Sequence, residues 1–112
     1  MSAIDTVRQS FAAYRRQDKT TAERLLADDF VFTSPQDDHI DKTAWLQRCF
    51  PTADRFRSQE ILHLVSTGED ERVLLVYEYE LADGRRYRNA ERIRVRDGQL
   101  VETEVFFGGS VA

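Results

Sequence analysis

The sequence predicts an α+β fold, with helices in the first half of the chain and antiparallel strands in the second. Apolar residues recur at helical intervals up to about residue 50. From residue 55 onward, long β-rich stretches are interrupted only at Gly68 and at two turns, residues 82–84 and 96–98. Helices followed by a run of strands are typical of the α+β class. With 112 residues, the chain is expected to form one domain, 1–112.

Composition and charge restrict the classes of function. Hydrophobic residues make up 41% and charged residues 32% of the chain, an ordinary balance for a soluble protein. The net charge of −4 argues against nucleic acid or an anionic membrane as the partner, because such partners require a basic patch. The single cysteine, Cys49, excludes an internal disulfide, and residues 1–10 contain no apolar run of the signal-peptide type. We therefore expect a cytoplasmic protein without a membrane span.

Three helices are expected in the first half of the chain. The first begins at a capping box formed by Ser2 and Asp5. Its apolar stripe at helical spacing consists of Ile4, Val7, Phe11 and Tyr14. A second helix is expected to begin near Thr20 or Thr21, and Asp41 is expected to cap a third helix that Pro51 ends.

The strands can be aligned by their charges. Residues 30–35, FVFTSP, are typical of a short strand that ends at the proline. At the turn over residues 82–84, alternation pairs Glu80 with Arg86, so that opposite charges face each other. Charged residues of the later strands then lie on an outer face, except for Glu91. We interpret this outer face as either solvated or a subunit contact.

The turn over residues 96–98 offers two registers. A three-residue loop places Glu91 opposite Thr103, whereas a two-residue loop places Glu91 opposite Glu104. Like charges opposite each other destabilise a sheet, so we expect the three-residue loop.

The other side of these strands, the inner face, is mainly apolar and contains a few polar groups, which is typical of a small-molecule site. Its residues are Val73, Leu75, Tyr77, Tyr79, Tyr87, Asn89, Glu91, Ile93, Val95, Val101, Thr103, Val105 and Phe107. Because burial of an unpaired carboxylate is costly, Glu91 must be protonated, hydrogen-bonded or in contact with pocket water. Two interpretations stay open. Glu91 either bonds Tyr77, Asn89 or a helix N–H and orders the core, or it is a pocket acid with a raised pKa.

Four segments resemble the nuclear transport factor 2-like superfamily. LLADDFVFTSP (25–35) and GQLVETEVFFGG (98–109) resemble the superfamily and, more closely, its bacterial SnoaL-like members. SPQDDHIDKTAW (34–45) and LADGRRYRNAE (81–91) are similar to members of that SnoaL-like group. The resemblance covers nearly the whole chain. It implies three N-terminal helices packed on a strongly curved antiparallel sheet that forms a conical barrel with an internal pocket. It also implies a homodimer through the outer face, but it names no reaction, because this scaffold hosts many functions.

Ketosteroid isomerase, an enzymatic relative, combines an Asp base with an oxyanion hole of one Tyr and one protonated Asp. The resemblance matches Glu91 with the protonated Asp. The position of the Tyr falls at Ser10, with Tyr14 one helical turn further on, and the position of the base falls at Ser34. An acid without that base and that Tyr cannot run the same isomerisation, so we exclude ketosteroid isomerase as the activity.

Other chemical groups are weaker candidates. The side chains of Asp37, Asp38, His39 and Asp41 are of metal-ligand type, but their run lacks a spacing that would bring them together. We expect no metal and no cofactor, and interpret the run as a polar loop over the pocket mouth. Whether Asp37, Asp38 and His39 contribute to the site stays open. His63 is expected to be a core or rim residue, and Cys49 an inert buried thiol.

The sequence therefore predicts a pocket protein that binds a hydrophobic small molecule. The candidate ligand-binding residues are Tyr14, Phe32, Ser34, Trp45, Tyr77, Asn89, Thr103, Val105 and Phe107. The alternative is an enzyme of the isomerase, cyclase or hydratase kind. Glu91 would be its catalytic acid or base, and Asn89, Tyr77 or Tyr14 would donate hydrogen bonds to the substrate. We also expect a homodimer through the outer face, with Phe106 and Leu100 among its charges.

Overall fold

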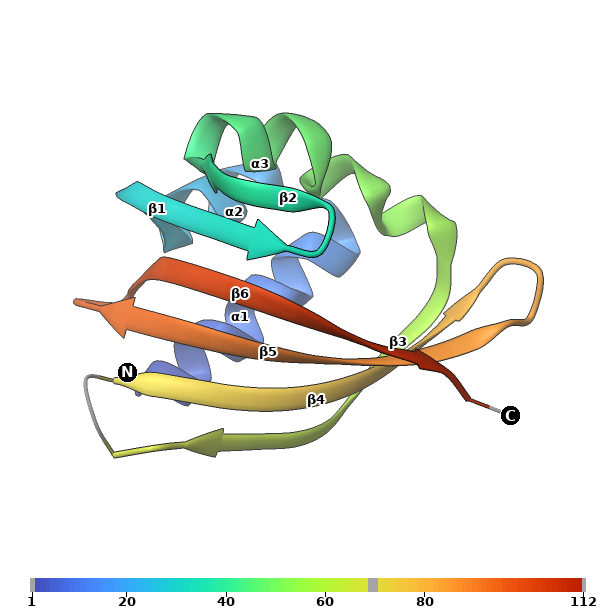
Figure 1. Ribbon diagram of the computed structural model, residues 1–112. Coiled ribbons are helices and arrows are strands. Elements are labelled where there is room, and N and C mark those ends of the chain that lie inside the picture. The colour runs from blue at the N-terminus through green and yellow to red at the C-terminus, as the bar shows by residue number, and fades with distance from the viewer. Residues whose placement is uncertain (1, 69–70, 112) are drawn as a thin grey trace.

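A six-stranded curved sheet, with helices over one of its faces, makes up the fold (Figure 1). The computed structural model describes residues 2–68 and 71–111. Its elements are α1 (Ala3–Arg16), α2 (Lys19–Leu25), β1 (Leu26–Ser34), β2 (Asp37–Asp41), α3 (Lys42–Arg48), the 3-10 helix η1 (Phe50–Arg55), β3 (Phe56–Ser66), β4 (Arg72–Leu81), β5 (Arg86–Arg96) and β6 (Gln99–Ser110). The predicted α+β class and three helices are confirmed.

The sheet has the strand order β2-β1-β6-β5-β4-β3. Neighbouring strands are antiparallel except β1 and β6, which are parallel, so the sheet is mixed. It is also open, because β2 and β3 are edge strands that do not pair with each other. The chain passes from one edge to the other through α3 and η1 (Figure 1), so helical segments take the place of a closing ladder.

Side-chain caps determine where the helices begin. Ser2 and Asp5 form the predicted capping box, with Ser2 Oγ accepting from Asp5 N at 3.1 Å and Asp5 Oδ2 accepting from Ser2 N at 3.2 Å. Asp41 caps α3 as predicted, accepting from Ala44 N at 2.9 Å. Helix α2 begins earlier than predicted, because Asp18 accepts from Thr21 N at 3.2 Å. An acidic residue is as good a cap as a hydroxyl, so the helix begins at Lys19, one or two residues before the predicted start near Thr20 or Thr21.

The polar run over residues 37–41 is a strand, not the predicted loop. It forms β2 and pairs with β1, with Phe32 opposite Ile40. Strand β1 is longer than the predicted 30–35, and Pro35 lies in the turn between the two strands. Pairing with β1 satisfies backbone groups on one side of the edge strand β2, and this contribution does not depend on apolar side chains.

The predicted register of β4 on β5 is confirmed, with Glu80 opposite Arg86 and Leu75 opposite Glu91. The predicted register of β5 on β6 is wrong. Arg96 pairs with Gln99, so the loop has two residues.

A register shift after this loop then places Glu91 opposite Val105, rather than opposite Thr103 or Glu104. The shift is a β-bulge beside Leu100 and Val101, which both point inward and are 4% and 7% exposed. The bulge removes the carboxylate clash that the two-residue loop would otherwise create. It also corrects the prediction that Leu100 lies on the outer face.

A second bulge, between Ile61 and His63, moves His63 to the outer face of β3. His63 is exposed there and does not line the inner face, so the expected core or rim position was wrong. The outer charges pair across strands, but Arg92 Nη2 lies 2.6 Å from Glu104 Oε1, whereas the three-residue loop would have placed Arg92 opposite Glu102.

The core lies between α1 and the inner face, and α1 passes behind β4, β5 and β6 in the view of Figure 1. Its buried residues are Val7, Leu26, Phe30, Val73, Leu75, Tyr77, Ile93, Val95 and Leu100. Of the helices in the described residues, none has the length and apolar character needed to cross a membrane.

Any side chain larger than that of glycine at position 108 should destabilise the pairing of β5 with β6. A Cβ added there would overlap the carbonyl oxygen of Arg88, whose neighbour Asn89 is part of the site. We expect Gly108→Ala to lower the free energy of unfolding by about 1–3 kcal/mol, because backbone must shift to relieve the overlap. Urea denaturation measures this, with Ser110→Ala on the same strand as the control. Equal stability of the two variants would contradict the predicted overlap.

Candidate functional site

A cavity of about 730 Å³ lies between the inner face and the helices α1, α3 and η1. This volume is within the range of small-molecule sites, about 300–1,000 Å³. Apolar side chains from both the sheet and the helices form much of its wall, among them Phe11, Leu26, Phe30, Ile93 and Leu100.

The structure brings the predicted site residues together. The cavity wall includes Glu91 and every predicted ligand-binding residue, namely Tyr14, Phe32, Ser34, Trp45, Tyr77, Asn89, Thr103, Val105 and Phe107. They come from α1, β1, α3, β4, β5 and β6, so strand alternation and helical spacing together were enough to find them. Their role in binding stays a prediction.

The carboxylate of Glu91 is buried and faces the cavity from the middle of β5, although the residue as a whole is partly exposed to the cavity space. Burial disfavours the charged form and raises the pKa of Glu91 to about 7, although a hydrogen bond with Tyr77 lowers it in part. Burial also raises the pKa of Tyr77, and the nearby Glu91 charge adds to this effect. The phenol therefore stays protonated and can donate to the carboxylate.

A chain of hydrogen bonds connects this carboxylate to the backbone. Gly108 N donates to Asn89 Oδ1 at 3.4 Å, and Asn89 Nδ2 donates to Tyr77 Oη at 3.3 Å. The Asn89 side chain therefore accepts one hydrogen bond and donates another. Because Tyr77 Oη accepts from Asn89, its own proton can be donated to Glu91. The two interpretations of Glu91 are compatible, because the same carboxylate orders the core and faces the cavity.

Two further polar atoms face the cavity without a partner. Within the described part of the chain, Gln59 Oε1 and Thr103 Oγ1 are buried and accept or donate no hydrogen bond. Buried polar groups are normally satisfied, so these two need water or a ligand in the cavity. Thr103 was predicted, but Gln59 was missed, although its polar side chain on a β-rich stretch was a usable signal.

Tyr14 is less available than predicted. Its Oη lies 2.7 Å from Thr52 Oγ1, and Thr52 Oγ1 donates its proton to Cys49 O at 2.7 Å. Tyr14 must therefore donate to Thr52, and only its lone pairs remain for a ligand. Ser10, which the resemblance aligns with the oxyanion-hole Tyr of ketosteroid isomerase, also lines the cavity.

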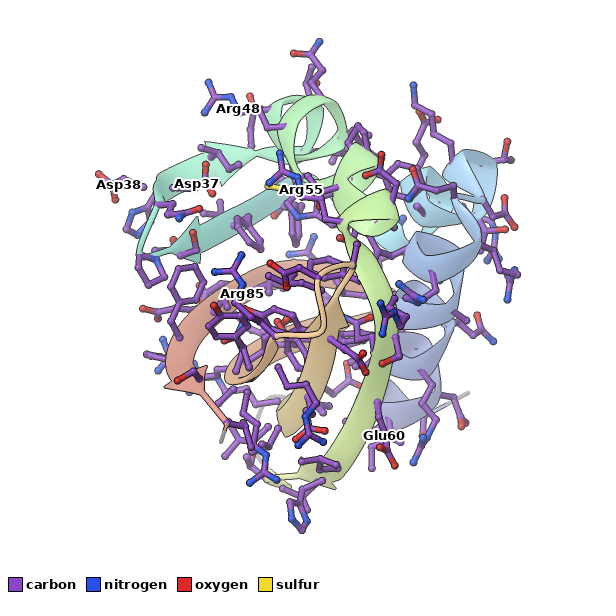
Figure 2. The ribbon with its side chains drawn as sticks, turned by 90° about the vertical axis from the view of Figure 1, so that its right-hand side faces the viewer. Asp37, Asp38, Arg48, Arg55, Glu60 and Arg85 are labelled. Atoms are coloured by element: carbon purple, nitrogen blue, oxygen red, sulfur yellow. The ribbon has the colours of Figure 1, made fainter. Side chains whose placement is uncertain are left out.

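A second carboxylate lies at the cavity mouth. Ser34 Oγ donates to Asp37 Oδ2 at 3.1 Å, and both residues line the cavity. Asp38 and His39 do not line it; they are exposed and contact each other at 2.6 Å, and Figure 2 shows Asp38 at the outer edge of the molecule. In residues 2–68 and 71–111, no group of three or more His, Cys, Asp or Glu side chains could hold a metal ion.

The mouth also carries arginines, which sequence reasoning missed. Arg48 and Arg55 line the cavity, and Figure 2 shows both on the side of the molecule that carries Asp37. Cys49 lies between them in sequence and lines the same wall. Burial raises the pKa of the Cys49 thiol to about 11, so it is uncharged and unreactive at neutral pH, as expected.

The chain belongs to the SnoaL-like domain family, whose model matches residues 7–103. This confirms the resemblance found in the sequence. Among proteins with curated descriptions, none matches the sequence.

Solved structures share the fold. A protein from Kribbella flavida is 23% identical with a TM-score of 0.81, covering 95% of this chain and 86% of that one. A candidate ketosteroid isomerase from the same organism is 17% identical with a TM-score of 0.77, covering 98% of this chain and 80% of that one. A candidate polyketide cyclase from Pseudomonas putida is 15% identical with a TM-score of 0.72, covering 96% of this chain and 92% of that one. At such identities the similarity establishes the fold only.

The buried Glu91 should make stability depend on pH. The folded protein holds the Glu91 proton more tightly than the unfolded chain does, because its pKa rises from 4.5 to about 7. Protonated Glu91 therefore makes its full contribution to the free energy of unfolding below pH 4.5, and this contribution is lost as the pH rises through about 7. We expect Glu91→Gln to remove this loss and to gain on the order of 3 kcal/mol over wild type at about pH 8.

Urea denaturation between about pH 4 and pH 8 measures this difference. The control is Glu60→Gln, because Glu60 is an exposed glutamate of β3 that Figure 2 places away from the cavity mouth. Parallel pH profiles for wild type and Glu91→Gln would contradict the burial of a titrating carboxylate.

Proposed function

We propose that the protein binds a hydrophobic small molecule in the cavity. The observation that carries this proposal is a largely apolar cavity, lined also by Glu91, in which Gln59 Oε1 and Thr103 Oγ1 lack hydrogen-bond partners among the described residues. A ligand with an apolar body and a polar atom at this depth would satisfy these groups and remove apolar surface from water. Membership of the SnoaL-like family is consistent with a small-molecule ligand.

A second candidate is an enzyme of the isomerase, cyclase or hydratase kind. The observation that favours it is the pKa of Glu91, which lies at about 7. A carboxyl group with such a pKa can both donate and accept a proton at neutral pH, and Tyr77 would support either state. The candidate cyclase and isomerase among the structural neighbours suggest the same class of chemistry. Conversion of a bound molecule that Glu91→Gln abolishes without loss of binding would favour the enzyme.

A neutral apolar fluorophore, phenylnaphthylamine, tests the binding proposal. We expect its emission to increase with the wild-type protein, because the cavity removes the probe from water. Ser10→Trp should reduce its affinity by at least about tenfold, since an indole from α1 fills space that the probe needs. Thr20→Trp on the exposed face of α2 is the control. Undiminished binding to a folded Ser10→Trp variant would place the probe outside the cavity and count against the proposal.

We further propose that the protein is a cytoplasmic homodimer that pairs through its outer face. Supporting this, five residues form an outer apolar patch across β3, β4, β5 and β6: Val65, Leu74, Val76, Ala90 and Phe106. Cross-strand ion pairs flank this patch, such as Arg88 with Glu78 at 3.1 Å. A two-fold axis through the patch would bury its apolar surface and leave the charges at the rim. The one cysteine, Cys49, requires no oxidising compartment.

Phe106→Asp should dissociate the dimer, because it places a charge in the centre of the outer apolar patch. The matched control is Phe107→Asp, since Phe106 and Phe107 are 47% and 50% exposed but point to opposite faces. Sedimentation velocity at micromolar concentration distinguishes monomer from dimer. A wild-type monomer, or a Phe106→Asp variant that remains dimeric, would refute pairing through this patch.

A further inference from the structure

Two arginines at the cavity mouth have no partner among residues 2–68 and 71–111. Arg48 ends α3 and Arg55 ends η1, and both are exposed while lining the cavity. In the part of the chain that the structure describes, neither guanidinium makes a hydrogen bond or an ion pair. Their charge is therefore available to a ligand that enters the cavity.

This availability contrasts with those arginines of the sheet that form ion pairs. Arg57 contacts Glu80 at 2.7 Å, and Arg96 contacts Asp29 at 2.8 Å. The chain has 20 acidic and 16 basic side chains, so acidic partners are not scarce. Arg24, Arg72 and Arg94 likewise make no side-chain hydrogen bond or ion pair within the described residues, but they do not line the cavity, whereas Arg48 and Arg55 do.

The other charged and polar groups at the mouth do not cancel the two guanidinium charges. Asp37 lines the same opening, and its carboxylate accepts from Ser34 at 3.1 Å. One carboxylate against two guanidinium groups leaves this end of the cavity net positive. Arg85, which Figure 2 shows on the same side, is already bound to Asp83 at 2.7 Å.

The deep part of the cavity, unlike the mouth, disfavours an anionic group. Glu91, Gln59 and Thr103 lie on its wall, and a second anion beside Glu91 would be repelled or would force its protonation. An anionic group is therefore favoured at the mouth and disfavoured at the depth of Glu91.

We infer that the ligand of this cavity is amphipathic, with an apolar body inside and an anionic group at the mouth held by Arg48 and Arg55. This inference rests on the proposed function and specifies its ligand class. A carboxylate, sulfonate or phosphate group fits, because the planar guanidinium offers two parallel N–H donors to such oxygens. The apolar body supplies the burial, and the anion determines which end enters first.

A pair of related fluorophores tests the inference. Anilinonaphthalene sulfonate and phenylnaphthylamine share their aromatic rings and differ in the sulfonate. We expect the double variant Arg48→Gln/Arg55→Gln to weaken binding of the sulfonate by about tenfold, the equivalent of one charge-assisted hydrogen-bonded contact. Binding of the neutral probe should change by less than about twofold. Added salt should weaken binding of the sulfonate probe and leave binding of the neutral probe unchanged.

The matched control is Arg24→Gln/Arg72→Gln, which removes the same charge from exposed positions outside the cavity wall. Equal losses of sulfonate affinity in the two double variants would overturn the inference, because only net charge would then matter. A third outcome is possible: Ser10→Trp weakens binding of the neutral probe, but Arg48→Gln/Arg55→Gln leaves the affinity for the sulfonate probe unchanged. This outcome would support the proposed function and contradict an anionic group on the ligand. Failure of both probes to bind would contradict the proposed function itself.

Discussion

The inner face of the sheet has to accommodate the carboxylate of Glu91. The bulge in β6, the hydrogen bond from Tyr77 and the cavity beside the carboxylate all serve this constraint. Glu91 lies between Leu75 and Val105 on the neighbouring strands, and no cation among the described residues stabilises its charged form. Burial therefore raises its pKa to about 7, and only Tyr77 offsets this in part. The alternative register would have placed Glu104 beside it, so the bulge in β6 is what makes a single buried acid tolerable. The carboxylate faces a cavity, where water or a ligand can complete its hydrogen bonds.

Much of the fold could be predicted from periodicity and caps. The register of β4 on β5 followed from opposite charges, because each pair there lies on a regular ladder. The register of β5 on β6 could not be predicted, because Leu100 and Val101 are both apolar and nothing in their sequence shows which one is the extra residue. Strand β2 was missed for another reason, since its stability comes from backbone pairing with β1.

The candidate site was predictable where it depends on strand alternation, and less so where it depends on contacts between distant segments. Alternation along β4, β5 and β6 identified Tyr77, Asn89 and Thr103 as inward-facing. The engagement of Tyr14 by Thr52 could not be seen, because it joins residues 38 positions apart. The basic mouth was missed for the same reason, as it combines the ends of α3 and η1 with the sheet. These contacts give the cavity two chemically different ends, a feature that the shared fold alone does not determine.

The central claim is that Glu91 is a buried acid facing the cavity with a pKa close to neutrality. A carbon-13 NMR titration of side-chain carboxyl groups measures this directly, with the Glu91 resonance assigned by its absence from Glu91→Gln. The account predicts a midpoint of about 7, well above the ordinary value of 4.5. A midpoint near 4.5 would contradict it, because a carboxylate that titrates normally is solvated and does not lie on an apolar wall.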